Sequence, residues 1–265
     1  MGFMDFLHSV ADTMLGWVKM AQNRQVGWQT VNREDGKFVR EQEPLMKKLK
    51  MLFLFNPLTE WIDTTHAMRL YMHNKSIEEG KEYSKEASRN QIKGFVDFYN
   101  INMDDFEPSD VEKYRTFEDF FIRKHKEGSR PIYAQGDNSK AVVVADCRCV
   151  VYDTVAESHK LWIKGSDFSI TNLVMDTQLG KQFADGPTAS FRLSPQDYHR
   201  YHSPVTGKIK LFRSMPGDYY EVDPVAITSK VDIVTRNARD YVVIETKEFG
   251  DVLFVAIGAT EVGTV

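Results

Sequence analysis

The runs Tyr241-Val-Val-Ile-Glu245 and Val252-Leu-Phe-Val-Ala-Ile257 decide the fold class of this chain. Both are short and rich in β-branched and aromatic residues, which is typical of strands. Upstream, Ala141-Val-Val-Val-Ala145 and the segment from Val205 to Phe212 repeat the pattern, with glycine and proline between the runs. The sequence therefore predicts a β-rich region over about residues 111–265.

The first part of the chain has a helical period instead. Apolar residues between Phe3 and Val18 recur three and four positions apart, and the segments 44–71 and 76–100 also read as helical. We expect a mainly helical N-terminal region over residues 1–110. Helices first and strands later favour an α+β fold, with the N-terminal helices packed on the β-rich domain 111–265.

Composition excludes some classes of protein. The 265 residues carry a formal net charge of −4, whereas nucleic-acid binders usually carry a large basic excess. Purely apolar runs such as Met51 to Phe55 are far shorter than the ~20 residues that cross a bilayer. Cys147 and Cys149 form no disulfide framework, so they say nothing about the compartment.

The densest polar segment is Phe191-Arg-Leu-Ser-Pro-Gln-Asp-Tyr-His-Arg-Tyr-His-Ser-Pro204. Histidine titrates near neutrality and relays protons, and Asp197 lies two positions before His199. From residue types alone, a polar turn with partly exposed histidines is an equally good interpretation. A metal site at His199 and His202 is disfavoured, because no third ligand is evident and the spacing is not that of a helical zinc motif.

This segment closely resembles the signature of the phosphatidylserine decarboxylase family, and the resemblance extends over roughly residues 85–265. Further blocks follow in the order of the family: Thr116–Lys124, Gly128–Ile132, Val144–Arg148, Trp162–Gly165, Pro216–Pro224, Asn237–Arg239, Phe249–Gly250 and Val255–Gly263. The Asp-Cys-Arg, Trp-Ile-Lys-Gly and Tyr-Tyr forms are similar to the larger, eukaryotic-type branch.

The resemblance implies a pyruvoyl cofactor made from the protein's own chain. In this family a serine attacks the carbonyl of the preceding glycine, the chain is cut, and the new C-terminal fragment begins with a pyruvoyl group. The ketone then forms a Schiff base with the substrate amine, which allows carbon dioxide to leave. The expected partner of a large chain is thus a small, pyruvoyl-bearing alpha chain.

The resemblance also assigns roles to residues. Asp146 and His202 match the pair that activates the serine for self-cleavage, in which the histidine takes the hydroxyl proton. Asp197 is expected to help orient that histidine. His199 matches the histidine of the decarboxylation step, with a role in proton transfer. For Asp146 alone, a turn-capping carboxylate is the simpler interpretation. The residues predict no metal site.

The cleavage motif itself is not found. The pairs Gly128-Ser129 and Gly165-Ser166 lie inside other family blocks, so we expect the pyruvoyl-forming serine beyond Val265. On this interpretation the chain is the large (beta) part of the enzyme, incomplete at its C-terminus. Residues 1–265 alone are then expected to be inactive.

Three functions stay open at this point. The first is a carboxy-lyase that converts phosphatidylserine to phosphatidylethanolamine. The second is a soluble decarboxylase of a free amino acid, for example an aromatic one. The third is a non-catalytic relative that binds a lipid or a partner chain.

The expected location depends on the function. A lipid substrate predicts peripheral contact with a membrane surface through residues 1–20 and 45–62, including Lys47, Lys48 and Lys50. A free amino acid predicts a soluble cytoplasmic protein. A homodimer is compatible with either.

Overall fold

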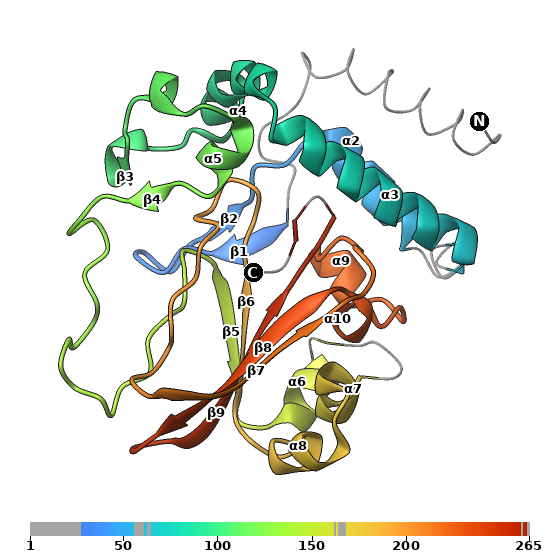
Figure 1. The fold of residues 1–265 in the computed structure, drawn as a ribbon, viewed down its shortest axis with the longest axis vertical. Coiled ribbons are helices and arrows are strands. Elements are labelled where there is room, and N and C mark those ends of the chain that lie inside the picture. The colour runs from blue at the N-terminus through green and yellow to red at the C-terminus, as the bar shows by residue number, and fades with distance from the viewer. Residues whose placement is uncertain are drawn as a thin grey trace. The chain divides into compact units, whose positions relative to one another are not determined.

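The computed structural model describes residues 28–55, 61–62, 65–161, 163, 168–260 and 262–263. The chain divides into two compact units, residues 1–59 and residues 60–265. Helices and small antiparallel sheets make up both parts, so the predicted α+β class is confirmed (Figure 1). The predicted N-terminal helix between Phe3 and Val18 and the Trp162–Gly165 block lie outside the described residues, apart from Ile163.

The first unit contains a small hairpin and a helix. Strands β1 (Gln29–Val31) and β2 (Phe38–Arg40) pair antiparallel, and α2 (Leu45–Leu54) follows. Met51 is buried, whereas Leu49, Leu52 and Phe53 leave 49%, 42% and 61% of their surface exposed. An apolar stripe of α2 therefore faces outward.

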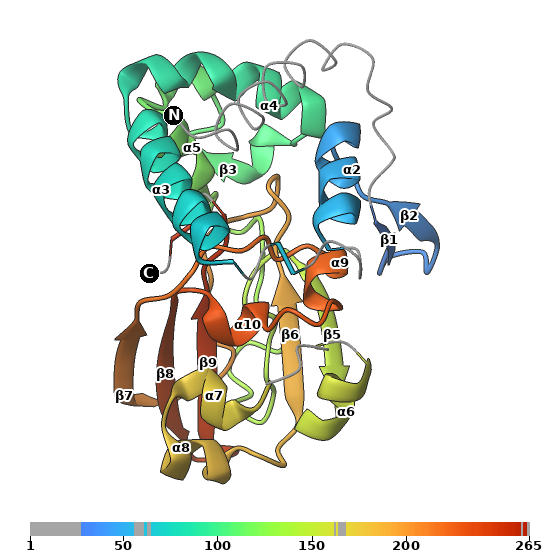
Figure 2. The same cartoon turned by 90° about the vertical axis from the view of Figure 1, so that its right-hand side faces the viewer.

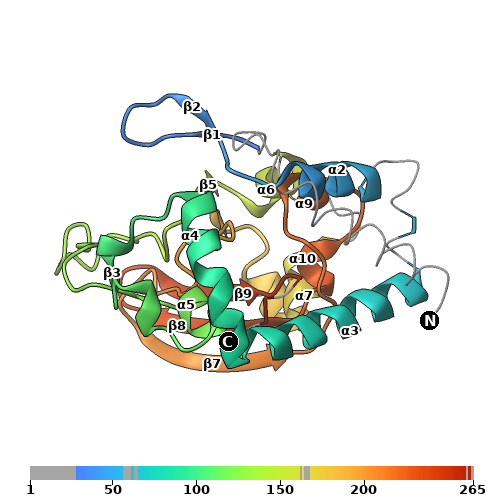
Figure 3. The ribbon, with the colours of Figure 1, turned by 90° about the horizontal axis from the view of Figure 1, so that it is seen from above.

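The second unit opens with helices. They are α3 (His66–Tyr83), the 3₁₀ turn η2 (Glu86–Gln91), α4 (Ile92–Tyr99) and α5 (Phe117–Phe121), and the chain changes direction between α3 and α4 (Figure 3). The N-termini of α3 and α5 are capped by the hydroxyls of Thr65 and Thr116, each of which accepts a backbone N–H three residues on. A common apolar cluster stabilises this part; it consists of Ile92, Tyr114, Phe117 and Phe120, with Tyr83, Phe95 and Val96 packed against it.

Two strands of two residues each lie before and after α5 and pair with each other. The 3₁₀ turn η3 (Met103–Asp105) leads into β3 (Phe106–Glu107), which pairs with β4 (Lys124–His125) after η4 (Val111–Lys113) and α5. The register places Phe106 opposite His125. The imidazole of His125 is thereby fixed beside an aromatic ring.

Strands β5 (Arg148–Tyr152) and β6 (Thr188–Arg192) form a second antiparallel pair. Between them lie the short helices α6 (Val155–Leu161), α7 (Ile170–Val174) and α8 (Thr177–Gln182). The predicted strand at Ala141–Ala145 is wrong, because the chain there is irregular. Its backbone bonds to the loop 202–204, where Pro204 has no N–H to extend a ladder.

The largest sheet has the strand order β7-β8-β9, with β7 (Lys208–Met215), β8 (Arg239–Thr246) and β9 (Gly250–Ile257) all antiparallel. The predicted runs at Tyr241–Glu245 and Val252–Ile257 lie within β8 and β9, whereas β7 begins three residues after Val205. Between β7 and β8 lie only the four-residue helices α9 (Pro224–Ile227) and α10 (Ile233–Arg236).

Short helices cover one face of this sheet (Figure 2). The core between them contains Ile170, Leu173 and Val174 of α7, Ile227 of α9, Val234 of α10 and Tyr241 of β8, with Leu211, Met215, Leu253, Val255 and Ile257 of the sheet against it. Alternate strand residues point to this one face, as the period of two requires.

Asn237 joins two loops at the end of the sheet. Its side chain is fully buried; Oδ1 accepts from the N–H of Tyr220 at 2.9 Å, and Nδ2 donates to the carbonyls of Tyr220 and Gly258, both at 2.8 Å. Gly217 lies so close to this junction that a Cβ there would sit 2.3 Å from the Arg236 carbonyl. The loop 216–224 is thus held at one place on the sheet.

Candidate active site

Strand register brings the two predicted site segments together. Arg148 starts β5 and pairs with Arg192, which ends β6, so the residues just before β5 lie beside those just after β6. Two further bonds join the segments: the N–H of His202 donates to the Val144 carbonyl at 2.8 Å, and the N–H of Val142 donates to the Pro204 carbonyl at 2.9 Å. Asp146 and the loop 193–204, which carries His199 and His202 and is called the histidine loop below, are therefore neighbours.

Asp146 is held by an arginine. Nε of Arg130 lies 3.0 Å from both carboxylate oxygens of Asp146, and the same guanidinium reaches Asp105 at 3.3 Å. The hydrogen bond to Asp146 raises the pKa of Arg130 above its ordinary value. A terminal nitrogen of Arg130 also lies 2.9 Å from Oδ2 of Asp146, so the guanidinium fixes the orientation of the carboxylate.

A histidine also faces Asp146. Nε2 of His125 lies 3.6 Å from Oδ2 of Asp146. The ring of His125 stacks on Phe106, at 5.0 Å between centroids, and on Tyr198, at 4.0 Å. Burial lowers the pKa of His125, and the charges of Arg130 and Arg123 lower it further while Asp146 opposes them. His125 is therefore expected to be neutral at pH 7.

His202 meets this group through Tyr198. Nε2 of His202 lies 3.0 Å from the hydroxyl of Tyr198, and the planes of the two rings are nearly parallel, at an interplanar angle of 2°. Among the described residues no hydrogen bond or ion pair joins Asp146 directly to His202. Their connection passes through His125 and Tyr198.

His199 does not join this group and packs against α5 instead. Its ring stacks on Phe121 with 3.8 Å between centroids, and its Nε2 lies 3.0 Å from the Ser194 carbonyl. A carbonyl can only accept, so neutral His199 carries its proton on Nε2. Burial lowers the pKa of His199 from 6.5 to about 4, against the opposing hydrogen bond to Ser194.

Asp197 braces the turn that carries His199. Its carboxylate forms an ion pair with Arg148 and accepts the N–H of Ser194 at 2.7 Å. The carbonyls of Gln196 and Asp197 accept from the buried guanidinium of Arg123, which lies over the rings of Phe106 and Phe120. We predicted that Asp197 orients His202, but in the structure Asp197 is linked to His199 instead, since Ser194 bonds to both of these side chains.

Sequence reasoning missed three of these residues. His125 directly follows the Thr116–Lys124 block, Arg130 lies inside the Gly128–Ile132 block, and Tyr198 stands between Asp197 and His199. Their positions were visible, but their partners come from other segments. A stack between a strand residue and a loop residue leaves no trace in spacing.

Two other features carry no chemistry of their own. Burial raises the pKa of the Cys147 thiol to about 11, so this thiol is not a ready thiolate ligand. In the described part of the chain, no three His, Cys, Asp or Glu side chains gather as a metal site would require.

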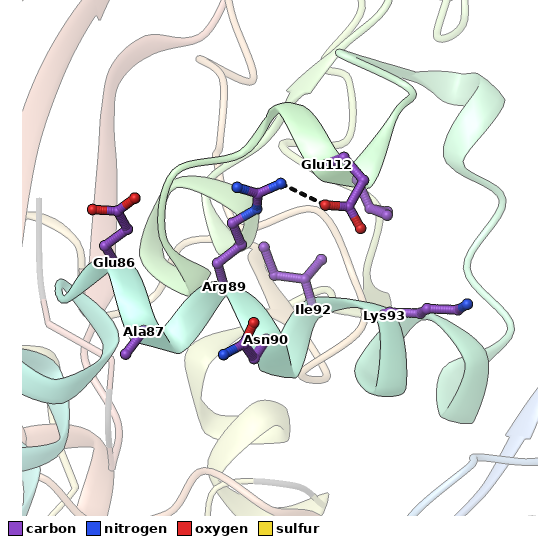
Figure 4. A pocket seen from close by; sticks show the side chains of 8 residues that line it. Glu86, Ala87, Arg89, Asn90, Ile92, Lys93 and Glu112 are labelled. Carbon is purple, nitrogen blue, oxygen red and sulfur yellow. Dashed lines mark hydrogen bonds and ion pairs between the residues drawn. The ribbon is translucent and has the colours of Figure 1, made fainter.

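A surface depression of about 730 Å³ lies away from the predicted residues. It is bordered by η2, the start of α4 and η4, and the ion pair between Arg89 and Glu112 crosses it (Figure 4). None of the predicted site residues lines it, and its charged rim is typical of a solvated groove.

The fold and the site define an α+β protein with histidines and carboxylates gathered around one loop. The family model of phosphatidylserine decarboxylase matches residues 117–265. The chain belongs to the phosphatidylserine decarboxylase family.

Similar proteins come from yeast, a plant and a bacterium. Phosphatidylserine decarboxylase proenzyme 2 of Komagataella phaffii is 33% identical over 88% of this chain, and the one of Oryza sativa subsp. japonica is 38% identical over 87%. The matches span only 23% and 36% of those two relatives. The proenzyme of Fusobacterium nucleatum is 34% identical over 89% of this chain and 77% of its own length.

Proposed function

We propose that this chain is the large part of a pyruvoyl-dependent carboxy-lyase that converts phosphatidylserine to phosphatidylethanolamine. The observation that carries the proposal is the group formed by Asp146, His125, Tyr198 and His202, which lies within the segment matched by the family model. The name proenzyme, given to the relatives, supports a chain that is cleaved.

The site residues fit the formation of a pyruvoyl group. Nδ1 of His202 is not engaged by Tyr198, which contacts Nε2, so in the tautomer with the proton on Nε2 the lone pair of Nδ1 can accept a hydroxyl proton. The pyruvoyl group, when present, supplies a ketone that reacts with the substrate amine and withdraws electrons as carbon dioxide leaves. The small chain that would carry it is the proposed partner.

The roles proposed for the described residues differ. His202 takes the serine proton during self-cleavage, and Asp146, held by Arg130, supplies negative charge nearby. His199, neutral at pH 7, exchanges a proton at the substrate carbon that loses carbon dioxide. Asp197 holds the turn that presents His199.

The proposed location is the surface of a membrane. Within the described residues no helix has both the length and the apolar character needed to cross a bilayer. Leu49, Leu52 and Phe53 on the exposed side of α2, together with Lys47, Lys48 and Lys50 of the same helix, suit an anionic interface.

A mass measurement tests the cofactor. The complete proenzyme should separate into two chains, the smaller with the mass of a ketone-capped fragment. Borohydride with phosphatidylserine should then trap an adduct on the small chain. If residues 1–265 alone trapped the substrate and released carbon dioxide, the pyruvoyl account would be wrong.

The substrate is tested separately. Release of carbon dioxide from carboxyl-labelled phosphatidylserine should exceed release from free aromatic amino acids. The reverse ranking would assign the chain to amino-acid metabolism.

A further inference from the structure

Tyr198 stands between two histidines. It is 4% exposed, its ring stacks on His125, and its hydroxyl lies 3.0 Å from Nε2 of His202. A buried tyrosine hydroxyl needs a hydrogen-bond partner, and here that partner is the histidine assigned to self-cleavage. Tyr198 thus contacts the proposed base itself.

A histidine base requires a fixed ring and a fixed tautomer. In serine hydrolases a carboxylate bonded to the imidazole supplies both. In this site the carboxylate of Asp146 is engaged by Arg130 and faces His125 instead. The atom that contacts the ring of His202 is the hydroxyl oxygen of Tyr198.

His125 in turn determines where Tyr198 can lie. Its imidazole is stacked between Phe106 and Tyr198, and its edge faces Asp146. The charged groups around it are Asp146, Arg130 and Arg123. These groups hold His125 in place. Because Tyr198 stacks on His125, it has little freedom to turn away from His202.

We propose that Tyr198 is the positioning residue of His202, and that His125 holds Tyr198 in place against Asp146. The inference rests on the proposed function, because it assigns the orientation of the base that function needs. In this arrangement Nε2–H of His202 donates to the Tyr198 hydroxyl oxygen, and Nδ1 keeps its lone pair.

The proton balance of the first step of self-cleavage, which turns the glycine–serine amide into an ester, follows from this tautomer. The serine hydroxyl gives its proton to Nδ1 as its oxygen bonds to the glycine carbonyl carbon. The bond from that carbon to the amide nitrogen breaks, and the nitrogen receives the proton from Nδ1. His202 ends the step neutral, with its proton again on Nε2.

Nitrogen NMR tests the orientation without any activity. In protein labelled with ¹⁵N-histidine, His202 should show the Nε2–H tautomer. Tyr198→Phe, which keeps the ring and loses the hydroxyl, should convert it to the mixed tautomers of a free imidazole. Tyr201→Phe is the matched control, since the ring of Tyr201 packs on Phe254. A His202 signal unchanged by Tyr198→Phe would overturn the inference.

Self-cleavage of the complete proenzyme gives the second readout. Loss of one hydrogen bond that orients the base should slow cleavage by roughly tenfold in Tyr198→Phe. His125→Phe keeps a ring to stack and loses the edge that faces Asp146, so it should cleave at an intermediate rate and show partly mixed tautomers. Tyr201→Phe should cleave like the parent.

The two proposals fail in different ways. If the parent proenzyme never cleaves while Tyr198 fixes the tautomer, the proposed function is wrong and the positioning stands. If the parent cleaves and Tyr198→Phe cleaves equally fast, the positioning is wrong and the function stands.

Discussion

Arg69 of α3 and Asp218 of the loop 216–224 are joined by two hydrogen bonds although 149 positions separate them in the chain. Nε donates to Oδ2 at 2.9 Å and a terminal nitrogen donates to Oδ1 at 3.1 Å. In the same place His73 of α3 packs on Tyr219, with 5.4 Å between ring centroids. The Arg69–Asp218 pair fixes α3 to the loop 216–224, which Asn237 also holds through the backbone of Tyr220.

Removing this pair should destabilise the protein slightly. The side chain of Arg69 is 41% exposed and that of Asp218 16%, so solvent screens much of the attraction. A double-mutant cycle of Arg69→Ala and Asp218→Asn in urea should give a coupling of about 1 kcal/mol. The pair Lys85 and Glu82, 59% and 65% exposed, is the control and should show almost no coupling.

Asn237→Ala should be far more harmful. It removes three hydrogen bonds and leaves backbone groups of Tyr220 and Gly258 without their partner in a buried place. We expect a loss of about 2–4 kcal/mol in the free energy of unfolding, measured by thermal or urea denaturation. Asn90→Ala, on the exposed side of η2, should change it by less than about 0.5 kcal/mol.

The low pKa of His199 predicts a dependence of stability on pH. Folding lowers this pKa from 6.5 to about 4, so the unfolded chain takes up the proton more readily. The stabilisation is therefore complete above pH 6.5 and is lost as the pH falls toward 4. Urea denaturation at pH 7 and pH 5 should show a smaller fall in the free energy of unfolding for His199→Gln than for the parent. Equal falls would contradict the assignment.

The two loop histidines should separate the two stages of the reaction. In the complete proenzyme, His202→Ala should leave an uncleaved precursor, slower in cleavage by roughly 100-fold or more. His199→Ala should cleave and then turn over poorly. Gel electrophoresis and labelled carbon dioxide distinguish the two results, and Arg89→Ala in the remote depression should affect neither.

Lipid binding should depend on the lysines of α2. Each basic residue near an anionic surface contributes about 1 kcal/mol. Reversing the charge of Lys47, Lys48 and Lys50 together should abolish flotation with phosphatidylserine liposomes at low salt. The same reversal at the exposed residues Lys81, Lys93 and Lys247 is the control. Equal flotation of both variants would favour a packing role for α2.

The strands of the main sheet were predictable because their pattern is local. The apolar runs within β8 and β9 are continuous, rich in β-branched and aromatic residues, and end at turn residues. The run Ala141–Ala145 has the same composition but no partner strand, since its neighbour in space is the proline-containing loop 202–204. Strand propensity describes a single segment, whereas a ladder needs two.

The hairpin at residues 29–40 illustrates the same limit. Strands of three residues are too short for a period to emerge, and only the pairing of Val31 with Phe38 reveals them. In the site, Asp146, Asp197, His199 and His202 were found by their resemblance to a family pattern. The link through His125 and Tyr198 arises from the register of β3 with β4 and could be seen only in space.

The bond from the His202 amide to the Val144 carbonyl makes this site observable from the backbone. An amide bonded in this way exchanges its hydrogen for deuterium only when the two segments part. The exchange rate of this single amide therefore measures how often the histidine loop lifts away from the Asp146 segment. This measurement of site opening needs neither substrate nor cofactor.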